Sequence, residues 1–401
     1  MMTGVLRELA TSIFVALPYQ VADRIHPWRR RMHRETPVTC ATPGERTLLI
    51  GPVNSAGQGY AWARAAERLP GVSAVDLMYR GRADRFMFPA DHSVPAEVAS
   101  GIRRWQDAER AAILRSFTHV IVESGARLFG THAPVADHLR AMTDAGVEVA
   151  LLFHGSDIRL PSRNAQEEKD SPFADDDAET RQLEEIARNN RALIDATGLP
   201  VFVSTPDLLA YVPEASWLPV VVDPDRWDAA APSTALTRAR PVVVHAPSRA
   251  GLKGSALIDP VVRRLHDEGV IEYREVQGIP SGDMPAVYGA SDIVLDQFSL
   301  GIYGVAACEA MASGRLVISH VSDLVRGEVR ERTGVELPIL ESTADGLEDL
   351  LRDVVARPDR YAAVAARGPA FVRDVHDGRR SAAALAPFLG VADPSAGAAG
   401  I

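Results

Sequence analysis

The chain has 401 residues, 46% of them hydrophobic and 24% charged, which is enough for two folded domains and typical of a soluble globular protein. Its formal net charge of −10 argues against a general nucleic-acid-binding protein, which is usually basic. Two cysteines, Cys40 and Cys308, show no zinc-binding or multi-disulfide spacing, and no run of about 18 apolar residues predicts a transmembrane helix. These features fit a reducing, cytoplasmic setting.

Residues 1–46 precede the first clear strand and are predicted to form a helical extension. Apolar residues recur at roughly helical spacing over 5–17. A basic cluster follows around Trp28, formed by Arg24, Arg29, Arg30, Arg31 and Arg34. An amphipathic helix next to basic and aromatic residues can lie on an anionic membrane, which would place residues 1–35 at the inner face of the membrane. Docking of the extension on the body of the protein is the favoured interpretation.

A first series of strands and helices is predicted over 47–224. Its opening strand, 47–53, runs into a loop with Gly57 and Gly59, and a helix begins at Tyr60. A strand, a glycine loop and a helix form a common ligand-binding geometry, so both glycines are candidate residues of a loop on the acceptor side. A tight turn that needs glycine explains them equally well. Further strands are predicted over 72–79, 119–123, 147–153, 201–204 and 217–222, and helices over 98–117, 132–145 and 179–196.

The strand 147–153 leads directly into His154 and Asp157. Polar side chains at the C-terminal end of a parallel strand point into the ligand crevice, so both are candidate catalytic residues. The alternative is a histidine satisfied by local backbone groups and an aspartate that caps a helix. The acidic segment 161–180 is predicted to be a mobile loop whose three consecutive aspartates cap the next helix and bind no metal.

A segment rich in alanine, proline, serine and threonine, 225–240, is predicted to link this domain to a second one over 241–376. The first strand of the second domain, 241–245, is followed by Arg249 and Lys253 beside two glycines. Such a pair suits a diphosphate, because arginine offers a fork of donors and lysine a point charge. Exposed surface charge is the alternative. A helix over 255–267, a strand over 271–276 and a short helix over 283–290 follow.

The most informative stretch is 292–319. A short strand over 293–295 ends in Asp296, and a turn with Gly301 and Gly304 leads into a helix over 305–312 that contains Glu309. A second strand, 316–319, begins at once. Unpaired backbone N–H groups and the helix dipole make the start of such a helix a site for phosphate. Glu309 comes about one turn later, where its carboxylate can accept hydrogen bonds from sugar hydroxyls.

This stretch resembles the donor-binding signature of GT-B glycosyltransferases, in particular the large retaining group known as family 4 (glycosyl transferases group 1). That signature has two glutamates separated by seven residues, with a Gly-aromatic-Gly-apolar run just after the first. Glu309 matches the second glutamate and is followed by Ala-Met-Ala-x-Gly, and Gly304 and Val305 match the end of the loop. Gly301 stands where the first glutamate belongs, the carboxylate that touches the transferred sugar in the family. Asp296 is the candidate to take over that role.

The resemblance implies an α/β fold of the GT-B type, with two Rossmann-like, doubly wound parallel-sheet domains facing a central cleft, and the strand–helix alternation agrees with it. It implies transfer of a hexose-type sugar from a nucleoside diphosphate, UDP or GDP, to an acceptor hydroxyl with retention, without a metal or another cofactor. Arg249 and Lys253 would neutralise the phosphates, and Ile279 would lie in the loop that holds the base. Glu309 would hold the ribose, and His154 would orient the sugar. The last helix, 377–390, would cross back to the N-terminal domain, before a disordered tail over 391–401.

The acceptor is expected to be a glycan, a lipid-linked glycan or a small metabolite, as in glycan or cell-surface polysaccharide biosynthesis, and nucleic acid is not expected as a partner. Two alternatives stay open. One is a non-catalytic nucleotide-sugar-binding protein that assists another transferase, which Gly301 favours. The other is a nucleotide-sugar epimerase of the same fold.

Overall fold

The computed structural model describes residues 23, 26–231 and 234–392. The apolar stretch 5–17, Arg24 and residues 393–401 of the predicted tail lie outside this part of the chain. Within it, no helix is both long enough and apolar enough to cross a membrane.

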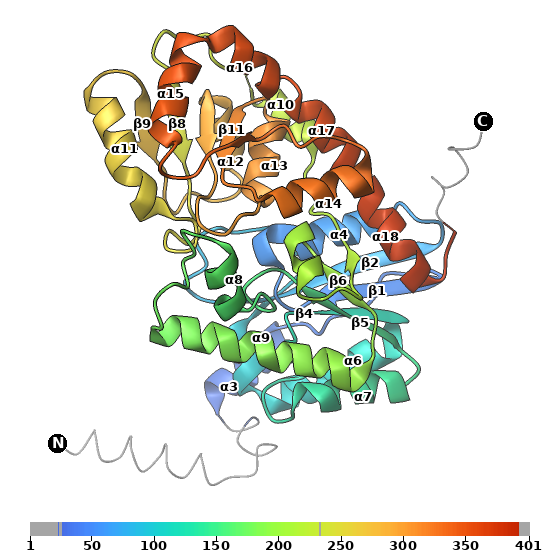
Figure 1. The fold of residues 1–401 in the computed structure, drawn as a ribbon. Helices are drawn as coiled ribbons and strands as arrows, with labels where there is room; N and C mark the ends of the chain where they lie inside the picture. Colours follow the sequence, from blue (N-terminus) through green and yellow to red (C-terminus); the bar gives the residue numbers. More distant parts are fainter. Residues whose placement is uncertain (1–22, 24–25, 232–233, 393–401) are drawn as a thin grey trace, which may run out of the picture.

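The N-terminal domain is built on a seven-stranded parallel sheet with the order β3-β2-β1-β4-β5-β6-β7 (Figure 1). The strands are β1 (Arg46–Gly51), β2 (Val72–Arg80), β3 (His92–Pro95), β4 (His119–Glu123), β5 (Glu148–Phe153), β6 (Val201–Val203) and β7 (Ser216–Trp217). The central strands are buried on both faces because helices cover the sheet, which is why they read as continuous apolar runs in the sequence. The helices are α3 (Pro27–Glu35), α4 (Gln58–Ala66), α5 (Ala96–Gly101), α6 (Arg103–Ser116), α7 (Val135–Asp144), α8 (Pro161–Glu167) and α9 (Ala178–Thr197), with short 3-10 helices at Ser55–Gly57 and Pro206–Ala210.

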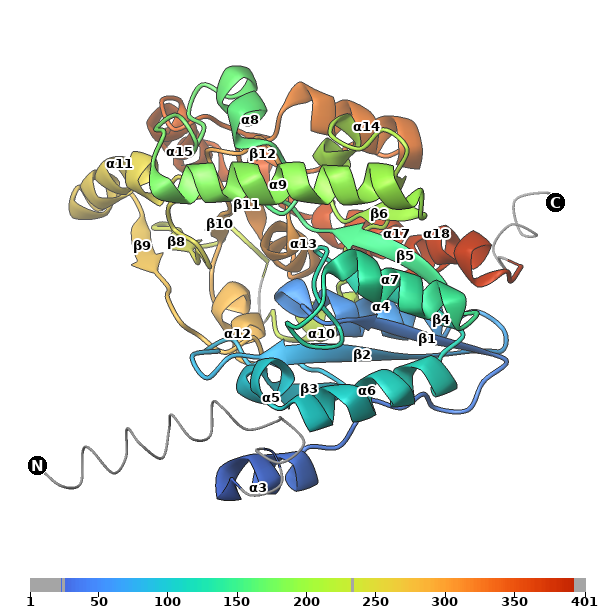
Figure 2. The same cartoon turned by 90° about the horizontal axis from the view of Figure 1, so that it is seen from below.

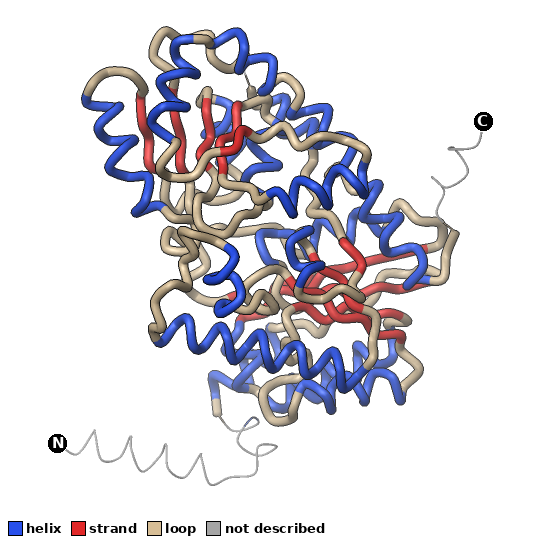
Figure 3. Tube along the Cα trace, in the orientation of Figure 1, coloured by secondary structure: helices blue, strands red, loops and turns tan. Residues whose placement is uncertain are grey.

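The C-terminal domain is built on a five-stranded parallel sheet with the order β12-β11-β10-β8-β9. The strands are β8 (Val242–His245), β9 (Glu272–Glu275), β10 (Ile293–Leu295), β11 (Leu316–Ser319) and β12 (Leu340–Glu341). The helices from the linker onwards are α10 (Pro224–Ala229), α11 (Ser255–Asp267), α12 (Met284–Gly289), α13 (Val305–Ala312), α14 (Asp323–Thr333), α15 (Leu347–Ala356), α16 (Pro358–Ala365), α17 (Gly368–Val375) and α18 (Arg379–Leu389). Figure 3 shows the two sheets as separate groups of strands, each flanked by helices.

The last helix returns to the N-terminal domain. Helix α18 packs against α4 (Figures 1 and 2). The ring of Phe388 meets those of His119 and Phe202 edge-on. The largest cluster of buried apolar side chains runs from the N-terminal sheet through α18 and α17 to α13. The two domains therefore share a continuous apolar contact on one side of the cleft, and α13 is anchored to it.

Several elements differ from the sequence-based predictions. The helix expected over 98–117 is two helices, because Ile102 is extended (φ −116°, ψ 93°). The expected loop 161–180 contains α8, which begins with a proline, and its Phe173 is buried, so the prediction of a mobile loop was wrong. Asp177 caps α9 as expected, accepting a hydrogen bond from the Thr180 N–H. Helix α14 was not predicted, and the strand expected over 217–222 shrinks to Ser216–Trp217.

Candidate functional site

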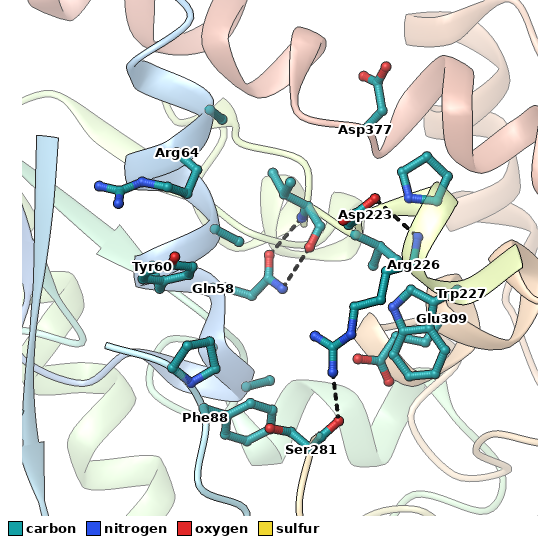
Figure 4. A pocket seen from close by; sticks show the side chains of 18 of the residues that line it. Gln58, Tyr60, Arg64, Phe88, Asp223, Arg226, Trp227, Ser281, Glu309 and Asp377 are labelled. Atoms are coloured by element: carbon teal, nitrogen blue, oxygen red, sulfur yellow. Dashed lines mark hydrogen bonds between the residues drawn. The ribbon is translucent and has the colours of Figure 1, made fainter. Parts of the chain in front are cut away.

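A cavity of about 520 Å³ lies between the two domains (Figure 4). One wall is α4 with the nearby Phe88, and the opposite wall is α10 with Ser281 and Glu309. Figure 4 shows Tyr60 and Phe88 on one side, facing Arg226 and Glu309 on the other. The cavity is therefore built from residues that come together only in the two-domain arrangement.

The N-terminus of α13 is open. Gly304 precedes the helix in an extended conformation (φ −134°, ψ −162°), and a Cβ atom at this glycine would meet no atom within 4 Å. A helix start carries backbone N–H groups without intrahelical partners, together with the positive end of the helix dipole. Gly304 and Val305, which the sequence predicts as donor-binding residues, therefore stand where an anion can approach the backbone.

Glu309 lines the cavity one turn further along α13 and is half-buried. Burial raises the pKa of its carboxyl to about 8; the charges of Arg226 and Lys253 lower this pKa, and that of Asp296 raises it. No described residue donates a hydrogen bond to this carboxylate or forms a salt bridge with it. Glu309 therefore presents carboxyl oxygens to the cavity that can accept hydrogen bonds from a ligand.

The two predicted phosphate-binding cations are both paired with carboxylates. Lys253 Nζ lies 2.5 Å from Asp296 Oδ1 at the end of β10, where the Asp296 side chain is only 2% exposed. Arg249, which is half-exposed, forms an ion pair with Glu179 at the start of α9 in the other domain. Of the two, only Arg249 reaches across to the other domain, and neither lines the cavity of about 520 Å³. A bound diphosphate would compete with these carboxylates.

His154 lies just after β5, as predicted, and its side chain is 12% exposed. Its Nε2 is 3.1 Å from Oε1 of Glu123, and its ring lies nearly parallel to that of Trp62, with centroids 5.7 Å apart. Burial lowers the pKa of His154, but the hydrogen bond and charge of Glu123, with the charge of Asp157, outweigh it, so the pKa is raised overall. The imidazole is therefore held in place and biased toward its charged form.

Glu123 is the residue that the sequence analysis missed here. This fully buried carboxylate at the end of β4 accepts hydrogen bonds of 2.7 Å from the backbone N–H groups of Val53 and Asn54 and also contacts His154. It ties the glycine loop after β1 to His154. A glutamate that closes an otherwise apolar buried strand was the available signal.

Asp157 lies in the turn that follows β5. Its carboxylate accepts hydrogen bonds from the backbone N–H groups of His154 and Gly155 and from the Ser124 hydroxyl, the last at 2.6 Å. These bonds close the turn after β5. The Asp157 carboxylate therefore contacts the backbone at His154 directly, and its catalytic role stays a prediction.

The predicted loop residues occupy three different settings. Gly57 lines the cavity with a positive φ of 75°, and a Cβ there would lie 3.0 Å from the Phe88 ring. Gly59 lies in the first turn of α4, and a Cβ there would lie 3.3 Å from the Cα of Asn54. Ile279 is half-buried in the loop between β9 and α12, and it is Ser281 of that loop that lines the cavity.

The cavity also contains residues that no sequence motif indicated. Arg226 and Trp227 belong to α10, inside the segment expected to be a plain linker. The Arg226 guanidinium donates a hydrogen bond of 3.3 Å to the Ser281 carbonyl, and the Trp227 ring packs against Tyr288. An Arg-Trp pair within a segment of small residues was the signal that could have drawn attention to it.

Comparisons with known proteins identify the fold. No protein-family model matches the sequence, and no curated protein matches it. Among solved structures, sucrose-phosphate synthase from Thermosynechococcus elongatus is 14% identical, with 88% of this chain and 99% of that chain covered and a TM-score of 0.53. HepE of Anabaena, in complex with UDP and glucose, is 12% identical over 86% of this chain and 98% of that one, with a TM-score of 0.54. The catalytic domain of starch synthase IV from Arabidopsis thaliana, bound to ADP and acarbose, is 10% identical over 86% and 98%, with a TM-score of 0.54. The predicted fold is thereby confirmed: the chain has the two-domain GT-B fold that is found in these glycosyltransferases.

Proposed function

We propose that the protein is a glycosyltransferase that moves a sugar from a nucleoside diphosphate to an acceptor hydroxyl. The observation that carries this proposal is the unpartnered carboxylate of Glu309, which lines the interdomain cavity one turn beyond the open start of α13. The start of α13 can donate backbone N–H groups to a phosphate, and Glu309 can accept hydrogen bonds from hydroxyl groups one turn away. This spacing suits the diphosphate and the ribose of one ligand. The presence of UDP with HepE and of ADP with starch synthase IV, on the same fold, supports this assignment.

The donor binds mainly to the C-terminal domain in this proposal. As the sugar leaves, negative charge develops on the diphosphate, and the backbone N–H groups at Gly304 and Val305 stabilise it together with Lys253 and Arg249. When the donor binds, Lys253 leaves its ion pair with Asp296 and pairs with the phosphate. Arg249 likewise leaves the exposed Glu179 and pairs with the diphosphate. Preformed positive charge of this kind makes a metal ion unnecessary. The base lies against the loop that contains Ile279.

The N-terminal domain supplies the other half of the site. His154, oriented by Glu123, contacts the transferred sugar, and the acceptor enters along the wall formed by α4 and Phe88. Because the cavity needs both domains, closure would exclude the water that otherwise hydrolyses the donor. Transfer with retention of the anomeric configuration is part of the proposal.

Peripheral contact with an anionic membrane through residues 1–35 is a separate part of the proposal. Within this range, α3 carries the exposed Trp28 and several arginines. Deletion of residues 1–35 should abolish binding to liposomes that contain phosphatidylserine while nucleotide binding survives. Liposome binding retained by the shortened protein would contradict this part alone.

Donor turnover tests the central proposal. The protein is incubated with UDP-, GDP- and ADP-sugars, with and without a panel of sugar acceptors and with EDTA present, and nucleotide release is followed. Acceptor-dependent release of one nucleotide in EDTA is the expected result, and NMR of the product reports the anomer. Conversion of the donor to another sugar nucleotide without an acceptor would instead identify an epimerase. Binding without any turnover would leave a nucleotide-sugar-binding protein.

A further inference from the structure

Gly301, the glycine in the place of a signature glutamate, has no room for a side chain. Its backbone is left-handed (φ +66°), and a Cβ atom there would lie 2.1 Å from Oε1 and 2.7 Å from Cδ of Glu168. Glu168 belongs to the other domain, where it directly follows α8. The space beside this glycine is therefore filled by a carboxylate that reaches it from across the cleft.

Glu168 is held there by contacts within and between the domains. Its backbone N–H donates a hydrogen bond of 2.9 Å to the Asn164 carbonyl, which fixes the turn after α8. Its Oε2 lies 2.7 Å from Nε2 of His320, and Nδ1 of the same ring lies 2.7 Å from Glu341. A histidine between two carboxylates is charged, and the hydrogen bonds that His320 donates to Glu168 and Glu341 raise its pKa to about 10. The next residue, Lys169, adds a further interdomain ion pair, with Asp345.

The other oxygen of this carboxylate faces Gly301. No described residue hydrogen-bonds to Glu168 Oε1, the atom that lies over Gly301. Gly301 comes three residues before Gly304, which opens α13. A carboxylate oxygen is a strong acceptor for a hydroxyl group. Asp296, the other candidate carboxylate, is almost fully buried and already paired with Lys253.

We propose that Glu168 recognises a hydroxyl of the transferred sugar, so that the N-terminal domain supplies the carboxylate that position 301 lacks. This inference rests on the proposed function and makes Glu168 a specificity residue for the sugar and not for the nucleotide. His320 orients Oε2, which leaves Oε1 to accept the hydroxyl hydrogen bond. Glycine at 301 is then a requirement of the site, since any side chain there would displace the carboxylate.

Binding of UDP and of UDP-glucose, or of GDP and GDP-mannose if the guanine nucleotide is preferred, tests the inference by calorimetry. Glu168→Gln should weaken binding of the sugar nucleotide about tenfold or more and leave that of the bare nucleotide within about twofold. Gly301→Ala should reproduce the loss, because its Cβ expels the carboxylate while Glu168 stays in the chain. Lys169→Ala is the matched control: it removes the neighbouring interdomain ion pair and should leave the ratio of the two affinities unchanged.

The possible outcomes distinguish the role of Glu168 from the proposed glycosyltransferase function. A wild-type protein that is folded, by circular dichroism, and binds no nucleotide or sugar nucleotide would refute both. Normal nucleotide binding, with Glu168→Gln and Lys169→Ala altering the two affinities equally or not at all, would refute the role of Glu168 and leave the proposed function standing. In turnover, loss of the sugar contact predicts a higher KM for the donor in Glu168→Gln and an unchanged one in Lys169→Ala.

Discussion

Lys253→Met would leave the Asp296 carboxylate buried without its ion-pair partner. Asp296 is 2% exposed and Lys253 20% exposed, so water can replace the ammonium only in part. Removing one partner of a buried pair typically costs about 3–5 kcal/mol, because an uncompensated charge remains. The partial exposure of Lys253 brings the expected loss of unfolding free energy to about 2–3 kcal/mol.

The double variant Lys253→Met/Asp296→Asn separates the cost of an unpaired buried carboxylate from the contribution of the lysine itself to the free energy of unfolding. With no charge left behind, it should regain most of the lost stability and lie within about 1 kcal/mol of the wild type. Urea unfolding followed by circular dichroism measures all three proteins at pH 7. Neither variant should bind nucleotide well, since both lack the lysine. A Lys253→Met protein as stable as the wild type would refute the reasoning, because Asp296 would then not depend on Lys253.

Three further predictions rest on single contacts. Burial raises the pKa of the Glu309 carboxyl to about 8, so the wild type should lose stability as pH rises from about 5 to 8.5, while Glu309→Gln should not. The difference in unfolding free energy between the two proteins should change by about 4 kcal/mol over that range, and equal pH profiles in urea unfolding would contradict this. Glu123→Gln should lower the pKa of His154, which Glu123 holds above its usual range, and an unchanged pKa in NMR titration would be the opposing result. Gly289→Ala should cost about 1–3 kcal/mol, because its Cβ would lie 2.1 Å from the Ala230 backbone carbonyl; a wild-type urea midpoint would show that this helix contact is loose.

The elements that the sequence predicted best are those fixed by short-range pattern. Strand Ile293–Leu295, helix Val305–Ala312 and strand Leu316–Ser319 lie where they were predicted, because apolar runs bounded by a glycine turn leave little choice of period or boundary. The GT-B fold followed from the same stretch. A helix that is broken at a single residue was harder to predict. The extended backbone of Ile102 divides the amphipathic stretch into two helices, α5 and α6.

The side chains that complete the candidate site depend on contacts that are distant in sequence. Glu123 meets His154 over 31 residues, and Glu168 meets His320 over 152. Neither pair forms a motif, because each is brought together by strand order and domain packing. The two predicted cations, Arg249 and Lys253, could be located from the sequence, but the carboxylates with which they form ion pairs could not. Residue types at strand ends can thus be predicted, whereas their partners need the tertiary structure.

Calorimetric titration of UDP and GDP into the wild type, Arg249→Ala and Arg263→Ala tests the central claim, a nucleotide-sugar site in the cleft. Arg263, on α11, is an exposed arginine in ion pairs with Asp259 and Glu275, and it serves as the matched control. The proposed function predicts that one nucleotide binds to the wild type, about tenfold or more weakly to Arg249→Ala and equally well to Arg263→Ala. Absence of binding of either nucleotide to the folded wild type, or equal binding to all three proteins, would contradict a donor site at this position.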